Sequence, residues 1–171
     1  MSRDFNAQIP ILVEAGWKIH PMVFLGVYGA LAFGGTSQTY STANLCTVSS
    51  RSCGASSERL GVEVQIHFRP DSRVDPWAGY GLGVETASAS ASGGGVPQVT
   101  DSFTGFELAR FALGVDFRLT RLIGVGPFVG VDFGSYSHEQ LQAANFSQDQ
   151  NISNTALHEW LTLGMRVVFN P

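Results

Sequence analysis

Several features on which soluble and nucleic-acid-binding proteins depend are scarce in this sequence. Only 14% of its 171 residues are Asp, Glu, Lys or Arg, against about 25% in a typical soluble protein. Lysine, which soluble β-proteins place on exposed sheet edges, occurs once, at Lys18. The formal net charge is −4, so there is no basic footprint for nucleic acid, and we expect no such partner.

Long apolar segments are also missing. No apolar run approaches the roughly 18 residues that a membrane-spanning helix needs. The first residues, MSRDFNAQIP, lack the basic and then apolar regions of a secretory signal. Cys46 and Cys53 lie in one polar segment without a histidine nearby. We therefore expect a short-range disulfide formed in an oxidising compartment, and no metal or cofactor.

What the sequence has instead is alternation of apolar and polar residues. In LTLGMRVVF at 161–169 every odd-numbered residue is apolar, whereas the even-numbered ones include a glycine and an arginine. A period of two over this length predicts a β-strand between two different environments. It is also about the length that a tilted strand needs to cross a bilayer.

The same pattern recurs in seven segments, which predicts a single all-β domain over residues 1–171. Short turns and long polar segments, at about 35–58, 89–104 and 139–154, alternate between the strands. This arrangement is typical of an antiparallel up-and-down transmembrane β-barrel. We expect strands to begin at Ile9, Met22, Arg59, Trp77, Gly105, Val125 and Thr155.

Alternation alone does not say which face points outward, and a soluble lipocalin-like ligand-binding barrel with an apolar interior is the alternative. The polar face is rich in glycine, which weakens strands on a solvated surface but leaves room for large neighbours in a narrow lumen. Its charges have mixed sign and are dominated by arginine, which suits confined ion pairs. We therefore expect the apolar face outside and a lumen charge network of Glu14, Lys18, Glu63, Arg69, Glu85, Arg110, Asp116, Arg118, Asp132 and Arg166.

The charges and rings of the interior lead to two further expectations. An unpaired charge in a confined interior loses several kcal/mol of solvation. The expected partners of Glu63, Glu85, Asp116 and Asp132 are therefore Arg69, Arg110, Arg118 and Arg166.

Inward aromatic residues either line a pocket for a small apolar ligand or simply plug the lumen, and we favour the second. These residues are Phe24, Tyr28, Phe128, Tyr136 and Trp160.

Four segments carry a resemblance to a known family: DPWAGYGLGVE at 75–85, GFELARFALGVDFRL at 105–119, VGPFVGVDFGSYS at 125–137 and LHEWLTLGMRVVF at 157–169. They resemble small Gram-negative outer-membrane β-barrel proteins of the OmpA-like or OmpW-like eight-stranded kind. The resemblance is architectural and identifies no activity. It implies an outer-membrane location, contact with outer-membrane lipid, extracellular long loops, and a periplasmic C-terminus. It also implies that the barrel-assembly machinery reads the closing strand through Phe169. We expect a monomer.

An eight-stranded barrel is just wide enough for side chains to fill it, so we expect no open diffusion pore. The leading hypothesis is a non-enzymatic outer-membrane protein that serves envelope integrity, surface interaction or small-ligand passage. The alternative is a lipid-modifying outer-membrane enzyme, in which a histidine base activates a serine. Residues of these types at the expected extracellular rim are Ser135, Ser137, His138, Glu139, His158 and Glu159. No family motif of such enzymes is present, and we assign no catalytic residue.

Seven strands are one short of closure, because single-chain bacterial barrels have an even number. With a periplasmic C-terminus, counting back places Ile9 at the extracellular end of a descending strand, where a secreted barrel should not begin. We therefore expect the first strand and the signal peptide upstream of Met1. The strands at Ile9–His20 and Thr155–Phe169 should then flank a gap or pair in parallel.

Overall fold

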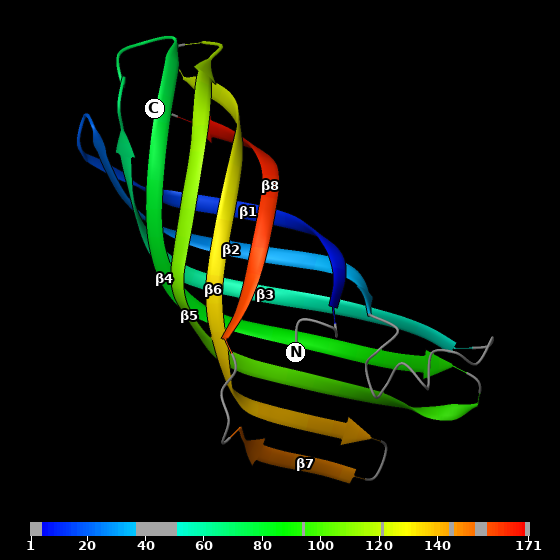
Figure 1. Ribbon diagram of the computed structural model, residues 1–171. Helices are drawn as coiled ribbons and strands as arrows, with labels where there is room; N and C mark the ends of the chain where they lie inside the picture. Colours follow the sequence, from blue (N-terminus) through cyan, green and yellow to red (C-terminus); the bar gives the residue numbers. More distant parts are fainter. Residues whose placement is uncertain are drawn as a thin grey trace.

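The computed structural model describes residues 5–36, 51–93, 95–120, 122–143, 146–152 and 157–169. They form one antiparallel sheet of eight strands (Figure 1). No helix in these residues is long and apolar enough to cross a membrane. The strands are β1 (Phe5–His20), β2 (Val23–Thr36), β3 (Arg51–His67), β4 (Val74–Gly93), β5 (Val96–Arg118), β6 (Ile123–Ala143), β7 (Phe146–Asn151) and β8 (Leu157–Phe169).

The predicted up-and-down topology is confirmed. Strands β1 to β7 follow one another in the sheet, and each is antiparallel to the next. β8 instead pairs with the first part of β6, Ile123–Ser135, whereas β7 pairs with its second part, His138–Ala143. Because β7 and β8 share one edge of β6, seven strands lie side by side. The seven predicted strands are β1 to β6 and β8.

The sheet is strongly curved but is not closed into a barrel. β1 and β8 form its two long edges, and no ladder joins them within the described residues (Figure 1). The closed barrel predicted from the sequence is therefore present only as an open sheet. The expected gap between the first and last strands of this chain is confirmed.

Three segments predicted as long polar loops are partly strand, which corrects the sequence-based boundaries. β3 begins at Arg51, β4 and β5 extend through 89–104, and β6 and β7 fill most of 139–151. Most of these residues are small or polar, so the segments lack the strong apolar period that identifies a strand. The backbone ladder needs only a paired neighbour, and the β3–β4 ladder runs from Arg51–Gly93 to His67–Trp77 without a shift of register.

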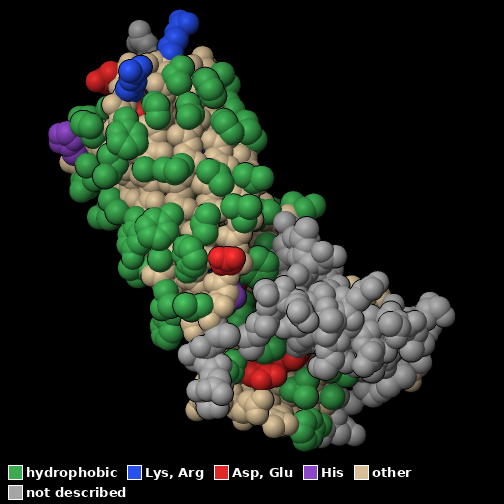
Figure 2. All heavy atoms as spheres, viewed as in Figure 1, with side chains coloured by type: hydrophobic (Ala, Val, Ile, Leu, Met, Phe, Trp, Pro, Cys, Tyr) green, Lys and Arg blue, Asp and Glu red, His purple; other side chains and the backbone are tan. Residues whose placement is uncertain are grey.

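The two faces of the sheet have opposite polarity. On the outer face large apolar side chains are open to the surroundings, among them Trp17 at 82% exposure and Val167 at 80%. Figure 2 shows such side chains spread over this face, with the visible basic groups at one end. The inner face holds Glu85 and Asp132, each 2% exposed. The predicted outward apolar face is confirmed over most of the described strand residues, and the interior holds buried charges that the apolar interior of a lipocalin-like barrel would lack.

One break in the alternation changes the content of the interior. Strict alternation over 105–119 predicts Leu108 and Arg110 on the same, inward face. The β5–β6 register instead shifts between Glu107 and Ala109, which is a β-bulge. As a result Glu107 and Arg110 are both buried, at 1% and 5% exposure, whereas Leu108 lies outside at 51%.

Candidate functional site: a polar lumen

Arg166 on β8 joins four strands through one guanidinium group. It donates hydrogen bonds to Asp116 on β5 at 2.9 and 2.6 Å, to Glu14 on β1 at 3.2 Å and to Gln65 on β3 at 2.9 Å. The same group lies 3.7 Å from the centre of the Trp77 ring on β4. The predicted pairing of Asp116 with an arginine is therefore confirmed.

Glu63 and Glu14 lie on either side of a shared amide. Gln65 Nε2 donates to Glu63 at 3.0 Å and to Glu14 at 3.1 Å. Arg110 pairs with Glu14 at 3.6 Å. Among the described residues Glu63 forms no direct ion pair with an arginine, although the predicted Arg110 and Arg166 lie close enough to interact with its charge.

The middle of the interior holds a second group of contacts between distant strands. The Tyr28 hydroxyl donates to Glu107 at 2.7 Å, and the Arg110 guanidinium lies 4.6 Å from the centre of the Tyr28 ring. Asp132 forms an ion pair with Arg59, rather than with one of the predicted arginines. The sequence analysis left Arg59 out of the charge network, and it missed Glu107 because of the bulge.

Glu85 is the centre of a third cluster, beside its paired neighbour Arg59 on β3. Its carboxylate accepts hydrogen bonds from Tyr136 at 2.8 Å and from Trp160 at 3.0 Å, and it lies 2.9 Å from His158 Nε2. The Tyr136 and His158 rings stack at 4.2 Å with an interplanar angle of 10°. None of the predicted arginines bonds to Glu85; Tyr136, His158 and Trp160, from β6 and β8, contact the carboxylate instead.

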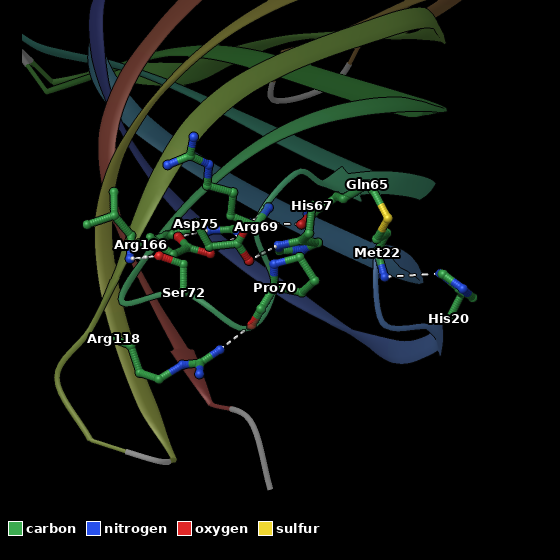
Figure 3. A network of polar contacts seen from close by, with 12 residues as sticks. His20, Met22, Gln65, His67, Arg69, Pro70, Ser72, Asp75, Arg118 and Arg166 are labelled. Atoms are coloured by element: carbon green, nitrogen blue, oxygen red, sulfur yellow. Dashed lines mark hydrogen bonds and ion pairs between the residues drawn. The ribbon is translucent and has the colours of Figure 1, made fainter.

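Three predicted members of the network lie outside it. Arg118 is exposed and donates to the carbonyl oxygen of Pro70, and the exposed Arg69 contributes its backbone N–H to Asp75 (Figure 3). Lys18 is exposed too, and has no ion pair among the described residues. These long side chains sit at the strand ends beside the short turns, where water can solvate the charge, so they need no buried partner.

His67 and Asp75 form a buried pair that the sequence analysis missed. His67 Nδ1 lies 2.8 Å from Asp75 Oδ2, and the two side chains are 3% and 9% exposed. Figure 3 shows the pair between the ends of β3 and β4. The only available signal was that both residues flank the RPDSRV turn, which brings the two strand ends together.

Aromatic rings fill the interior by lying over glycines of neighbouring strands. A Cβ on Gly61 would come within 2.5 Å of the Tyr28 side chain, and one on Gly164 within 2.7 Å of the Phe128 ring. An alanine at either place would collide with a buried ring. The prediction that inward glycines make room for large neighbours is confirmed at these positions.

The five predicted lumen aromatics do not enclose one common cavity. Tyr28, Phe128 and Tyr136 are buried at 1%, 8% and 3% exposure, and Trp160 is half-buried. Only Phe24 borders the cavity of about 920 Å³ that opens between β1 and β8. The described rings therefore occupy the lumen rather than surrounding a shared pocket.

The rim residues considered for catalysis are separated. His158 is buried beside a carboxylate, whereas His138 pairs with Asp149 at 2.6 Å on β7. Ser137 donates to the carbonyl oxygen of Thr104 rather than to either histidine. Among the described residues, no group of three or more His, Cys, Asp or Glu could hold a metal ion. Within the described part of the rim, no serine donates a hydrogen bond to a histidine, which is the contact that the enzyme hypothesis requires.

Cys53 on β3 is half-buried and disulfide-bonded. Its predicted partner, Cys46, lies outside the described residues, so the pairing stays a prediction.

Comparisons of this chain with protein-family models, with curated proteins and with solved structures found no match. The function proposed below therefore depends on the residues and the geometry alone.

Proposed function

We propose that this chain forms an integral outer-membrane β-barrel with a side-chain-filled polar lumen, and that it serves the cell envelope without catalysing a reaction. The supporting observation is the inverted polarity of the sheet. Leu163 and Trp17 are 72% and 82% exposed, while Glu107 and Asp132 are 1% and 2% exposed. In water this arrangement would leave a large apolar surface unburied, whereas in a bilayer it places each group in a matching environment.

The outer face also has a sharp boundary, as a membrane-embedded surface should. Glu58, Thr86 and Thr104 are paired neighbours in one row across β3, β4 and β5. On one side of this row the outward residues of these strands are apolar, beginning with Leu60 and Phe106 at 63% and 59% exposure. On the other side they are Ser, Thr, Gly and Gln residues. The row is the expected limit of the hydrocarbon region.

The filled lumen favours a structural or surface role over free diffusion of solutes. Ion pairs and rings from opposite sides of the sheet meet at several levels, around Arg166, Arg110 and Glu85. Beyond the apolar belt the same strands continue with polar residues on their outer face, where Ser88 and Ser102 share a hydrogen bond of 3.1 Å. This extension provides a surface for contacts outside the membrane.

The proposed orientation puts the short turns and the end of β8 on the periplasmic side, and the polar extension outside the cell. The apolar belt contacts outer-membrane lipid, and the barrel-assembly machinery reads the closing strand. No subunit interface is needed to bury the lumen charges, because partners on the same chain satisfy most of them, so we propose a monomer.

Flotation with lipid vesicles tests this function. The protein is refolded from denaturant with and without preformed phosphatidylcholine vesicles, and a density gradient follows an alkaline wash. We expect the protein to float with the vesicles, to resist the wash, and to leave a trapped small dye inside. A soluble monomer that stays at the bottom of the gradient would contradict the membrane location, and rapid release of the dye would contradict the filled lumen.

A further inference from the structure

Exposed basic residues gather at the end of the sheet that carries the short turns, which we call the turn end. Lys18 lies near the end of β1, Arg118 is the last residue of β5, and Arg69 and Arg73 lie in the turn between β3 and β4. All four are exposed, whereas Asp71 is the one exposed acidic residue of this end within the described residues. The surface of the turn end therefore carries mainly positive charge.

Two of these residues come from distant strands and border the same space. Lys18 and Arg118 both line the cavity of about 920 Å³ that opens between β1 and β8. Together they also line a smaller hollow of about 20 Å³, and His67 borders both spaces. Arg69 and Arg73 border neither space. Lys18 and Arg118 are therefore a pair of cations at one cavity.

The N–H groups of this pair are largely open to a ligand. The ammonium group of Lys18 has three donors, and it forms no ion pair in the part of the chain that the structure describes. The guanidinium group of Arg118 has five donors, of which one bonds to the carbonyl oxygen of Pro70 (Figure 3). Both side chains can therefore donate to an anion in the cavity.

The carboxylates around the cavity are already bound to other partners. Asp75 Oδ2 lies 2.8 Å from His67 Nδ1. Asp116 accepts two hydrogen bonds from Arg166, and Glu14 accepts another from the same guanidinium group. These acids therefore do not occupy the donors of the cation pair.

The outward wall of the cavity is apolar. Trp17 and Met165 line it, and they are 82% and 68% exposed on the outer face. Trp17 directly precedes Lys18, and the half-exposed Phe117 directly precedes Arg118. Tryptophan is enriched at the headgroup level of membranes, where long basic side chains also reach the interface. The cavity therefore combines two open cations with an apolar wall at one membrane interface.

We propose that this cavity binds an anionic phospholipid, with its phosphate between Lys18 and Arg118 and an acyl chain against Trp17 and Met165. Lysine and arginine hold phosphate oxygens through charge-assisted hydrogen bonds. A zwitterionic phosphatidylcholine binds less well, because the two cations repel its trimethylammonium group. A free anion would leave the apolar wall uncovered. The proposal rests on the membrane location proposed above and adds the class of lipid that the turn end selects.

Quenching of tryptophan fluorescence by brominated lipids tests the proposal, because Trp17 borders the cavity. The chain in phosphatidylcholine vesicles receives a small fraction of brominated phosphatidylglycerol or, in a parallel sample, of brominated phosphatidylcholine. The quenching gives the ratio of the two association constants. One basic residue near an anionic lipid strengthens binding about fivefold. We therefore expect the unchanged chain to prefer phosphatidylglycerol by about fivefold or more at low salt.

Paired variants locate the preference. Lys18→Gln with Arg118→Gln should bring the ratio close to one, whereas Lys18→Arg should keep it. Lys18→Gln alone leaves the contact of Arg118 intact and should lower the ratio in part. The matched control, Arg69→Gln with Arg73→Gln, removes the same charge from the turn end but not from the cavity, so its ratio should stay near that of the unchanged chain. Trp17→Phe should lose most of the difference in quenching between the two lipids.

Three results would overturn the phospholipid site. They are a ratio near one in the unchanged chain, an equal loss in the control pair, and a preference that survives the double change at Lys18 and Arg118. Inorganic phosphate should displace no more lipid than sodium chloride of equal ionic strength, and stronger displacement would identify a free anion as the occupant instead. Flotation of the same samples separates the two ideas: failure to float contradicts the membrane location, whereas floating without a lipid preference contradicts only the site.

Discussion

The proposed membrane belt makes a quantitative prediction at Leu113. This residue lies on the outer face of β5 at 58% exposure, near the middle of the apolar part of the strand. Its paired neighbours are Ala78 on β4 and Val129 on β6. The substitution Leu113→Arg places a guanidinium group at the expected bilayer midplane without touching the lumen.

The expected loss follows from two terms. An arginine on the lipid face of a barrel costs about 2–4 kcal/mol at the midplane. Removing a leucine from an apolar environment costs a further 1–2 kcal/mol or so, because roughly half of its side chain is open and full burial is worth about 1.5–3 kcal/mol. Together they predict a loss of about 3–6 kcal/mol in the free energy of unfolding. On a water-exposed surface the same change stays within about 0.5 kcal/mol.

Thr104→Arg is the matched control, because Thr104 is an exposed, outward residue of the same strand at the proposed belt boundary. There the expected cost is about 0–1 kcal/mol. Unfolding in urea, followed by tryptophan fluorescence in lipid vesicles, measures both variants against the unchanged chain. A loss at Leu113 below about 1 kcal/mol, or one equal to that of the control, would refute the membrane assignment of this face.

Two further predictions concern the lumen. Gly114→Ala should lower the free energy of unfolding by about 1–3 kcal/mol, because the new Cβ lies 2.6 Å from the Trp77 ring. Gly130→Ala is the control: the nearest heavy atom to its new Cβ is 3.6 Å away, so this variant should be nearly neutral in the same unfolding assay. Equal effects at the two glycines would contradict the packing of that ring. Arg166→Met should lower the free energy of unfolding by about 3–5 kcal/mol, because it leaves buried carboxylates without their counter-charge. Adding Asp116→Asn should recover part of the loss. If the double variant is as unstable as the sum of the single ones, the two residues are not coupled.

Much of the fold could be predicted from the local sequence pattern. The two faces of a strand meet different environments, so apolar and polar residues alternate along it. From Leu161 to Phe169 every odd-numbered residue is apolar, and such patterns led directly to the assignment of seven strands and of an outward apolar face. At 87–92 small Ala and Ser residues alternate, so the contrast between the two faces is weak, and the extension of β4 beyond Ser88 was missed. Pairing with β3 and β5 decides strand formation there.

The interior was less predictable, because the partners of a charge are set by how distant strands come together. The sequence alone determined that residues such as Glu85, Asp132 and Arg166 point inward. Only the tertiary structure decided that Glu85 is bound by Tyr136, His158 and Trp160, from strands that lie far away along the chain. The bulge beside Glu107 shifts side chains by one position, and alternation cannot anticipate it. Facing is a local property of the backbone, whereas pairing depends on curvature and register, which arise only when the whole sheet is assembled.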